Sequence, residues 1–277
     1  MPINDDDEKI SAFPSRTRAV GDPIDRRSGL FNRRPVAYLL SPMATLIAAR
    51  RALRRFADPR KANVLQRFFK AGKGEYAQGD RFLGVAVPAV RRVAKAARDL
   101  ALADVRRLLA SPLHEERLLA LLILVDQFRR ADERRQQQLC ALYLRHRAGV
   151  NNWDLVDCSA EHILGPSLLH RKKTLLFTLA ASPRVWDRRL AVMSTFHFIR
   201  RRRFLETLQL ARRLLKDEHD LIHKALGWML REIGKRDRRT LERFLMRYVA
   251  HMPRTMLRYA IERFPAAQRR AYLAGQT

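Results

Sequence analysis

The amino-acid sequence predicts an all-α protein built as a helical-repeat solenoid. From Met43 onward, apolar residues recur with a helical period, and the strong helix formers Leu, Ala and Arg dominate. Glycine and proline fall between these stretches, and no alternating polar and apolar run indicates a β-strand. We therefore expect about a dozen helices of roughly 10–18 residues, joined by short turns.

A weak internal repeat supports the solenoid. Arg117 begins the run Arg-Leu-Leu-Ala, Arg189 begins Arg-Leu-Ala-Val 72 residues later, and Lys224 begins Lys-Ala-Leu-Gly after a further 35. The pairs Ser111-Pro112 and Ser182-Pro183 open the first two helices, with serine as N-cap and proline in the first turn. Such a period is typical of helix pairs stacked into a curved array with a concave groove. Chance similarity among helices rich in Arg, Leu and Ala is the alternative.

The charge balance predicts a polyanionic partner. The chain has 277 residues and carries a formal net charge of +28, from 56 Lys and Arg against 28 Asp and Glu. Nucleic acid is the commonest polyanion for such a protein. A membrane-surface protein would concentrate its basic residues in one amphipathic helix, and this charge also disfavours a solenoid that binds only proteins.

The expected location is the cytoplasm. No apolar run approaches the roughly 18 residues that cross a bilayer. The two cysteines, Cys140 and Cys158, form no Cys-x-x-Cys pair, which favours a reducing compartment. The acidic start of the sequence, residues 5–8, has the wrong charge for a secretory signal.

Residues 1–42 differ from the rest of the sequence. They contain five prolines and no helical period, and their charges nearly cancel. We expect a disordered N-terminal tail over residues 1–42 and one repeat domain over residues 43–277. Met43 begins the first amphipathic stretch, so it is also a candidate for the original start of the protein.

The segment 150–157, Val-Asn-Asn-Trp-Asp-Leu-Val-Asp, is the most informative for chemistry. Asn152 is suited to cap the following helix, and Asp154 suits the positive end of that helix. Trp153 and Asp157 are four residues apart and therefore share a helical face. A carboxylate beside an indole is unusual in so basic a protein, although a buried tryptophan beside a solvated aspartate is the ordinary interpretation.

Two further segments add candidates. In Val185–Val192, Arg189 is suited either to hold a DNA phosphate or to orient a carboxylate, whereas Trp186 is expected to be a packing residue; a solvated arginine is the plain alternative. In Lys224–Glu232, Gly227 lies inside a predicted helix, where glycine costs about 1 kcal/mol relative to alanine. It indicates close approach of another helix or of a ligand.

With the upstream residues Glu75-Tyr76, Phe82–Pro88 and Arg91-Arg92, these segments resemble the AlkD-like DNA alkylation repair family over roughly residues 43–265. The most specific elements are the runs NWDLVD and KALGWMLRE and the spacing from Trp186 to Arg189. The resemblance implies HEAT-like repeats with a concave basic DNA-binding face. It also implies a glycosylase that removes N3- or N7-alkylated purines from duplex DNA without flipping the base.

The resemblance also assigns residues. It places the catalytic carboxylate at Asp157, the neighbouring aromatic at Trp153 and the site arginine at Arg189. The DNA contacts that we expect are Tyr76, Trp228, Arg91, Arg92, Lys224 and Arg231. Ala86 departs from the glutamine that some members carry near the lesion, which puts the substrate range in doubt.

No cofactor, metal or membrane is expected, and we expect a monomer. His219 and His223 are spaced as on a zinc-binding helix, but no third ligand follows by pattern, so we interpret them as surface or capping residues. The two cysteines are expected to pack. The competing function is a non-catalytic DNA-binding scaffold, which would gain nothing from a carboxylate that faces phosphates.

Overall fold

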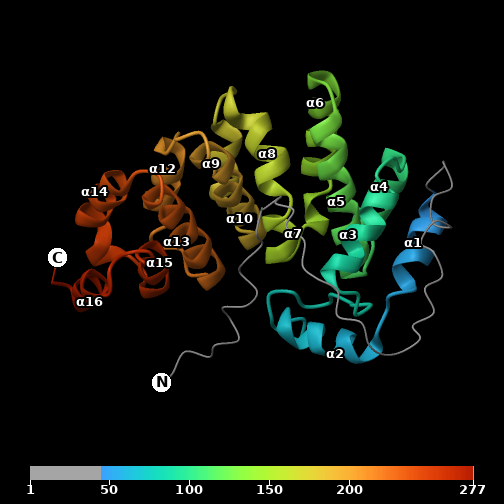
Figure 1. Cartoon of the computed structure of the whole chain (residues 1–277), viewed down its shortest axis with the longest axis horizontal. Helices are drawn as coiled ribbons and strands as arrows, with labels where there is room; N and C mark the ends of the chain where they lie inside the picture. The colour runs from blue at the N-terminus through green and yellow to red at the C-terminus, as the bar shows by residue number, and fades with distance from the viewer. Residues whose placement is uncertain (1–44, 277) are drawn as a thin grey trace, which may run out of the picture. The chain divides into compact units, whose positions relative to one another are not determined.

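The computed structural model describes residues 45–276, which are helical and contain no β-strand (Figure 1). They belong to a unit that spans Tyr38–Thr277. The expectations about residues 1–42, and about a start at Met43, lie outside the described residues. Among the helices of residues 45–276, none is long and apolar enough to cross a membrane.

Most helices follow one another with short connections, and the α-helices have between 4 and 17 residues, α5 being the longest. The short 3-10 helices η3 and η4 have three residues each. In chain order they are α1 (Leu46–Arg54), α2 (Pro59–Phe68), α3 (Val87–Ala96), α4 (Leu102–Leu109), α5 (His114–Arg130), α6 (Glu133–Arg145), η3 (Arg147–Gly149), α7 (Trp153–Asp157), α8 (Ala160–Leu169), α9 (Thr174–Ala180), α10 (Val185–Ser194), α11 (Phe196–Ile199), α12 (Leu205–Arg213), α13 (Asp220–Gly234), α14 (Arg238–Tyr248), η4 (Val249–His251), α15 (Arg254–Ala260) and α16 (Ala266–Ala274).

Helices are more numerous and shorter than the periodicity predicts, because hydroxyl side chains interrupt two of them. Ser159 donates its hydroxyl to the Leu155 carbonyl oxygen at 2.6 Å, and the helix is interrupted there, between α7 and α8. Thr195 donates its hydroxyl to the Val192 carbonyl oxygen at 2.7 Å, between α10 and α11. Such side-chain hydrogen bonds compete with the helical backbone bonds and bend or end a helix.

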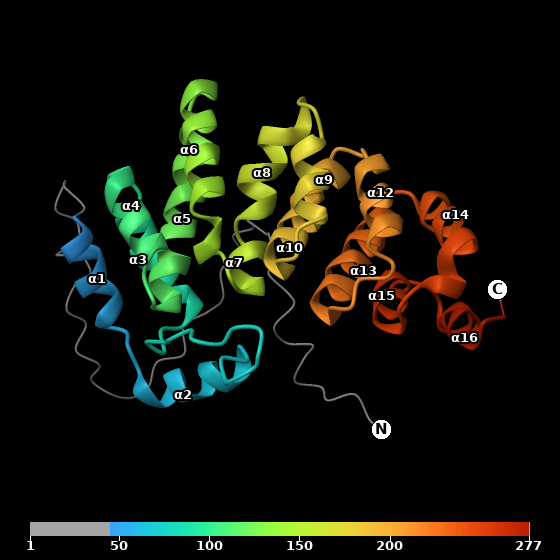
Figure 2. The same cartoon turned by 180° about the vertical axis from the view of Figure 1, so that it is seen from behind.

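Each helix packs mainly on its neighbours in sequence, as a solenoid requires. Helix α5 packs on α3 and α4, and α10 packs on α8, α9 and α13. Figures 1 and 2 show the helices in chain order along the unit, from α1 at one end to α16 at the other. Contacts of this local kind bury a continuous core through stacking of similar units.

The repeat is visible in the backbone contacts at the starts of α5, α10 and α13. Arg117 donates to the carbonyl oxygen of Ser111 at 2.9 Å, and Arg188 donates to that of Ser182 at 3.0 Å. At α13, the Nε2 of His223 lies 2.5 Å from the carbonyl oxygen of Asp217. The residue that matches Arg117 is therefore Arg188, not Arg189, and the spacings of these pairs are 71 and 35 residues. The predicted repeat is confirmed with its register shifted by one residue.

Two glycines permit close packing between helices. Gly165 is followed by Pro166 inside α8, which contradicts the expectation that such residues lie only between helices. A Cβ on Gly165 would meet the His197 Cβ at 2.4 Å, so only glycine lets α8 lie this close to α11. A Cβ on Gly227 would lie 2.5 Å from the Met256 carbonyl oxygen. The close approach predicted at Gly227 is thus that of α15.

Residues 69–86 connect α2 to α3, and a buried carboxylate fixes their last turn. The side chain of Glu115 on α5 accepts hydrogen bonds from the backbone N–H groups of Leu83, Gly84 and Val85 at 2.9, 2.8 and 3.1 Å. This 69–86 connection also carries Tyr76. Glu115 therefore holds the segment that carries Tyr76, a predicted site residue, against the helical stack.

Gly84 is expected to be indispensable to that turn. Its φ of +78° is left-handed, and a Cβ there would lie 2.0 Å from the Asp58 carbonyl oxygen. We expect Gly84→Ala to lower the free energy of unfolding by about 2 kcal/mol or more, from strain and the clash together. Gly74→Ala is the matched control, because Gly74 has a φ of +79° and open space around it. Thermal melts of both variants make the test, and equal losses would contradict the packing argument.

Candidate functional site

The centre of the candidate site is an ion pair between Asp157, the last residue of α7, and Arg189, in the first half of α10. The Nε of Arg189 donates to Oδ1 of Asp157 at 2.9 Å, and Nη2 donates to Oδ2 at 2.7 Å. Nη1 of Arg189 donates to the carbonyl oxygen of Leu221, at the start of α13. The Asp157 side chain is 15% exposed and the Arg189 side chain is 6% exposed. Arg189 thus fixes the plane of the carboxylate, which is one of the two roles considered for it.

Burial has the largest effect on the pKa of Asp157. It raises the pKa of Asp157 above the ordinary range, whereas the charge and hydrogen bonds of Arg189 lower it and Asp154 raises it slightly. Because both carboxylate oxygens accept from the guanidinium, the geometry is that of the ionised acid.

Aromatic side chains lie near the pair, and Tyr76 connects them to it, since it hydrogen-bonds the Trp153 side chain and the charge of Arg189 acts on it. The ring of Tyr76 packs edge-on to Trp186 with centroids 5.7 Å apart, and 6.2 Å from the ring of His219. Burial raises the pKa of Tyr76, and the Trp153 side chain and the charge of Arg189 lower it to a smaller extent. Trp186 is buried, as predicted, and packs on the core while contacting Tyr76.

Trp153 sits at the start of α7 and is half-buried between the 69–86 connection and α2. Its ring centroid lies 5.5 Å from that of Phe69 and 6.0 Å from that of Phe68. The side chain of Asn152 accepts a hydrogen bond from the Trp153 backbone N–H at 2.8 Å, so the predicted cap is confirmed. Trp153 and Asp157 are the first and last residues of α7.

The two histidines of α13 serve its N-terminus. Nδ1 of His219 accepts from the Leu221 N–H at 3.2 Å, and His223 contacts the Asp217 carbonyl oxygen. Burial lowers the pKa of His219. The contact of His219 confirms its interpretation as a capping residue, whereas His223 lies inside α13 and caps no backbone N–H. Within residues 45–276, no three or more His, Cys, Asp or Glu side chains are arranged to hold a metal ion.

Apart from Tyr76 on the 69–86 connection, the expected DNA contacts lie on two helices, α3 and α13. Arg91 and Arg92 are exposed on α3, and the Arg92 guanidinium lies 5.1 Å from the Phe56 ring centroid. On α13, Lys224 pairs with Asp220 at 3.2 Å, and Arg231 pairs with Glu262.

Trp228 also lies on α13. It packs on Phe196 with centroids 6.0 Å apart. It follows Leu221 by two helical turns, about 10 Å along the axis. Its place in the DNA-binding cleft therefore stays a prediction from the family resemblance.

A buried polar network beside the site escaped sequence reasoning. Its core is the run His114-Glu115-Glu116-Arg117 at the start of α5, in which all four residues are buried. Arg117 donates to Asp80 at 2.7 Å, and Asn151 donates to the same carboxylate at 2.9 Å. Four consecutive ionisable residues that open an apolar helix were the available signal, because such residues are buried only when paired.

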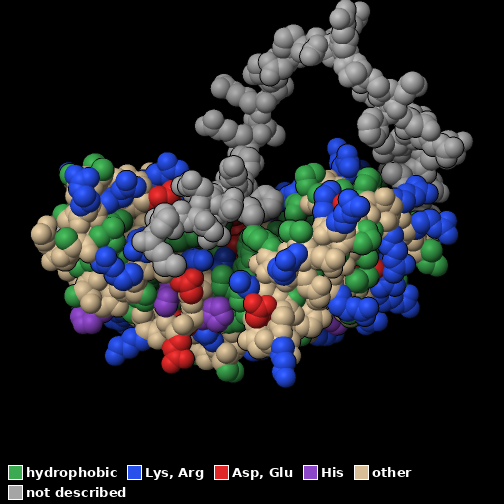
Figure 3. All heavy atoms as spheres, turned by 90° about the horizontal axis from the view of Figure 1, so that it is seen from below, with side chains coloured by type: hydrophobic (Ala, Val, Ile, Leu, Met, Phe, Trp, Pro, Cys, Tyr) green, Lys and Arg blue, Asp and Glu red, His purple; other side chains and the backbone are tan. Residues whose placement is uncertain are grey.

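The distribution of charge on one face is shown in Figure 3. Lys and Arg side chains are spread over this face and gather most at the end that holds α1. The start of α13 lies at the ion pair, because the Leu221 carbonyl oxygen accepts from Arg189, so the N-terminal end of this helix adds positive potential there. This electrostatic setting suits an anionic ligand.

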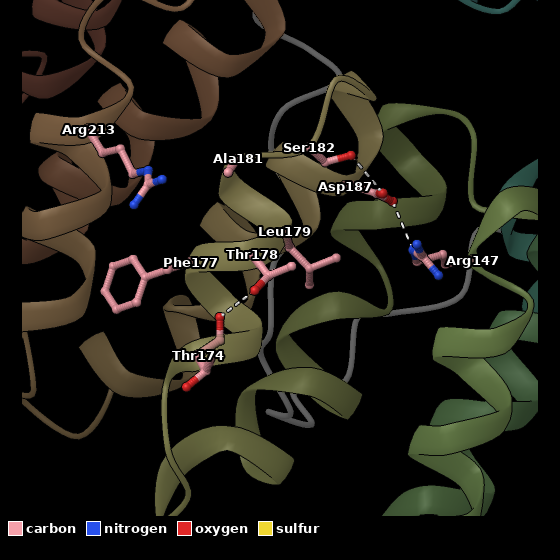
Figure 4. A pocket seen from close by; sticks show the side chains of 9 residues that line it. All are labelled: Arg147, Thr174, Phe177, Thr178, Leu179, Ala181, Ser182, Asp187 and Arg213. Atoms are coloured by element: carbon pink, nitrogen blue, oxygen red, sulfur yellow. Dashed lines mark hydrogen bonds and ion pairs between the residues drawn. The ribbon is translucent and has the colours of Figure 1, made fainter.

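A separate cavity of about 800 Å³ lies between α9, α10 and α12 and does not include the ion pair. Figure 4 shows Arg147, Ser182 and Asp187 on one side of it and Phe177 and Arg213 on the other. Asp187 is satisfied there, because Ser182 donates to it at 3.0 Å and Arg147 lies 3.3 Å from it. The cavity thus borders a structural contact at the start of α10.

Comparison with known proteins identifies the family of the chain. The family model of the DNA alkylation repair enzyme matches residues 49–264. A solved structure described as a predicted DNA alkylation repair enzyme from Enterococcus faecalis is 16% identical, with a TM-score of 0.59 over 76% of this chain and 97% of that one. No curated protein matches. The chain therefore belongs to the DNA alkylation repair enzyme family, and its role is DNA repair.

Proposed function

We propose that the chain is a DNA glycosylase that hydrolyses the N-glycosidic bond of purines alkylated at N3 or N7 in duplex DNA. The observation that carries this proposal is the oriented Asp157–Arg189 pair beside Tyr76 and Trp153. Alkylation at these positions makes the purine cationic and therefore a good leaving group. The sugar then gains oxocarbenium character as the bond breaks.

In this mechanism Asp157 stabilises the cationic sugar and orients the attacking water. Each of its oxygens accepts one hydrogen bond from Arg189, which leaves a further lone pair on each for a substrate or water. Arg189 acts through Asp157 and is a positioning residue. The faces of Tyr76 and Trp153 suit contact with the cationic sugar or base through their negative quadrupoles.

DNA would bind along a concave basic face, with α1 and α3 contributing phosphate contacts. Arg51 in α1 and Arg55, its C-cap, are both exposed, and four residues apart they lie on the same side of the helix. Exposed arginines also occur at Arg201, Arg202 and Arg239. The reaction needs no cofactor, since hydrolysis of a cationic nucleoside requires only water and electrostatic stabilisation, and we propose that the chain acts as a monomer.

The proposal is tested by base release from a duplex that contains a single 7-methylguanine. Release that depends on Asp157 supports a glycosylase. Tight binding to the same duplex without base release would instead favour a non-catalytic DNA-binding scaffold.

DNA binding is expected to depend steeply on salt. With about six phosphate contacts, the slope of log K against log salt concentration should be near −5, because each contact releases counterions. The double variant Arg51→Gln/Arg55→Gln should flatten the slope by about 1 to 2. Fluorescence anisotropy of labelled duplex between about 50 and 200 mM salt measures it. A slope shallower than about −2 would contradict binding along the phosphate backbone.

A further inference from the structure

His114, the first residue of α5, lies between two carboxylates that belong to different segments. It is 2% exposed. Its Nδ1 lies 3.2 Å from Oδ2 of Asp80, and its Nε2 lies 2.8 Å from Oδ2 of Asp154. An ionised carboxylate only accepts hydrogen bonds, so both ring nitrogens must donate. The geometry is that of an imidazolium.

The two carboxylates connect His114 to the segments that carry the candidate site. Asp80 belongs to the 69–86 connection, four residues after Tyr76. Asp154 belongs to α7, three residues before Asp157. His114 thus joins both segments to the first turn of α5.

Aromatic packing fixes the same ring. It lies 4.8 Å from both Phe69 and Phe82, centroid to centroid, and these two residues flank Tyr76 in sequence. Phe69 in turn contacts Trp153. Rotation or displacement of the imidazole would therefore disturb the surroundings of Tyr76 and of Trp153 together.

The charges around His114 make its proton important to Asp154 in particular. Asp80 has two other donors, Arg117 and Asn151. Asp154 is 11% exposed, its Oδ1 accepts no described hydrogen bond, and its described partner is His114. Loss of the His114 proton would leave the buried Asp154 carboxylate, in the first turn of α7, facing a neutral ring.

We propose that His114 is a positioning residue whose imidazolium holds α7 and the Tyr76 segment in their active arrangement, and that its deprotonation sets an alkaline limit on activity. The kinetic part of this inference rests on the proposed glycosylase function. The structural part is independent of it: a proton-dependent clamp, in which protonated His114 holds α7 and the Tyr76 segment together.

The pKa of His114 agrees with the geometry. Burial lowers this pKa, but the charge and hydrogen bond of Asp154 and the hydrogen bond of Asp80 raise it more, to about 9, against a smaller lowering by Arg117. A group whose pKa is raised by folding stabilises the folded state below its unfolded value. The stabilisation is fully present below about pH 6.5 and is lost as the pH rises through about 9.

The experiment compares wild type, His114→Gln and Asp154→Asn in two measurements between about pH 6 and 10. The melting temperature of wild type should fall as the pH rises from about 6.5 to 9, and His114→Gln should lack this dependence. The rate of base release at saturating enzyme should fall several-fold above about pH 9 in wild type.

Asp154→Asn distinguishes a positioning role of His114 from a simple structural role. It also serves as the second variant if His114→Gln fails to fold, because asparagine keeps a hydrogen-bond acceptor for His114. Removal of the charge should shift the alkaline limb of base release toward the ordinary histidine pKa of about 6.5. The exposed Asp126, which pairs with Arg130, supplies the control, since Asp126→Asn should leave the limb in place.

Two outcomes would overturn the inference. One is a melting temperature in His114→Gln with the wild-type pH dependence, and the other is an alkaline limb that Asp154→Asn leaves unmoved. If wild type releases no base at any pH, the glycosylase proposal fails, whereas the melting series still decides whether the clamp exists.

Discussion

Replacement of Asp157 by asparagine is expected to slow base release from a 7-methylguanine duplex by roughly 100-fold or more. The negative charge matters only as the sugar becomes cationic, so its loss raises the transition state and leaves the bound substrate almost unaffected. Asparagine has a similar shape and still accepts one hydrogen bond from Arg189. The loss of rate therefore reports the loss of charge.

DNA affinity is expected to hold or rise in the same variant, because a negative charge near phosphates has been removed. Single-turnover rates and anisotropy titrations separate the two quantities. Asp126→Asn is the matched control, since it removes an equal charge from an exposed pair with Arg130 on α5. Thermal melts show whether Asp157→Asn remains folded with Arg189 less fully paired. A wild-type rate in a folded Asp157→Asn protein would exclude Asp157 as the catalytic group.

The fold was predictable because its signals are local. Helical period and the Asn152 cap concern residues close in sequence. The serine caps predicted at Ser111 and Ser182 are wrong, because the N-caps of α5 and α10 are Leu113 and Arg184, and neither makes a side-chain cap hydrogen bond.

The register error at Arg189 has a physical cause: similarity of letters aligned Arg117 with Arg189, whereas the hydrogen bonds to Ser111 and Ser182 align Arg117 with Arg188. Backbone geometry, not residue type, defines equivalence between repeats.

The candidate site was predictable only in part. The spacing of Trp153 and Asp157 predicted that they share a helical face, and the family resemblance assigned Arg189 to the site; the structure joins Arg189 to Asp157. Asp154 looked like a favourable charge at a helix start. Its partner His114 lies 40 residues earlier in sequence, and no local pattern encodes such a contact.

The place of Trp228 in a DNA-binding cleft stays a prediction. The family resemblance assigns it to the cleft, and the structure gives its ring a contact with Phe196. Its position along α13 follows from the helix, whereas the distance to a bound DNA depends on curvature accumulated over several repeats. That quantity cannot be obtained from one helix at a time.

The remaining prediction concerns the charge of the lesion. Asp157 is the acid that the proposed mechanism uses, and its hydrogen bonds to Arg189 are those of a carboxylate. An ionised carboxylate cannot protonate a departing base. The reaction therefore requires a base that already carries its positive charge, such as 7-methylguanine or 3-methyladenine.

Neutral lesions are the informative comparison. Uracil, hypoxanthine and 8-oxoguanine leave as anions unless they are protonated, so their release should be slower by several orders of magnitude than that of cationic bases. The upward shift in the Asp157 pKa makes acidic pH a useful second condition. Protonation of Asp157 should not rescue neutral lesions if its role is electrostatic, because the group then loses the charge that stabilises the sugar.

A panel of duplexes, each with one lesion at the same position, measures this at a single enzyme concentration. His219 is the side chain to examine if neutral lesions are released, since it lies beside Tyr76 and its Nδ1 already accepts the Leu221 N–H, which places any donor on Nε2. Comparable rates on cationic and neutral lesions, abolished by His219→Ala, would replace the electrostatic mechanism with acid catalysis. Release confined to the cationic lesions, with Asp157 required for each, is the expected result, because only those bases depart without a proton.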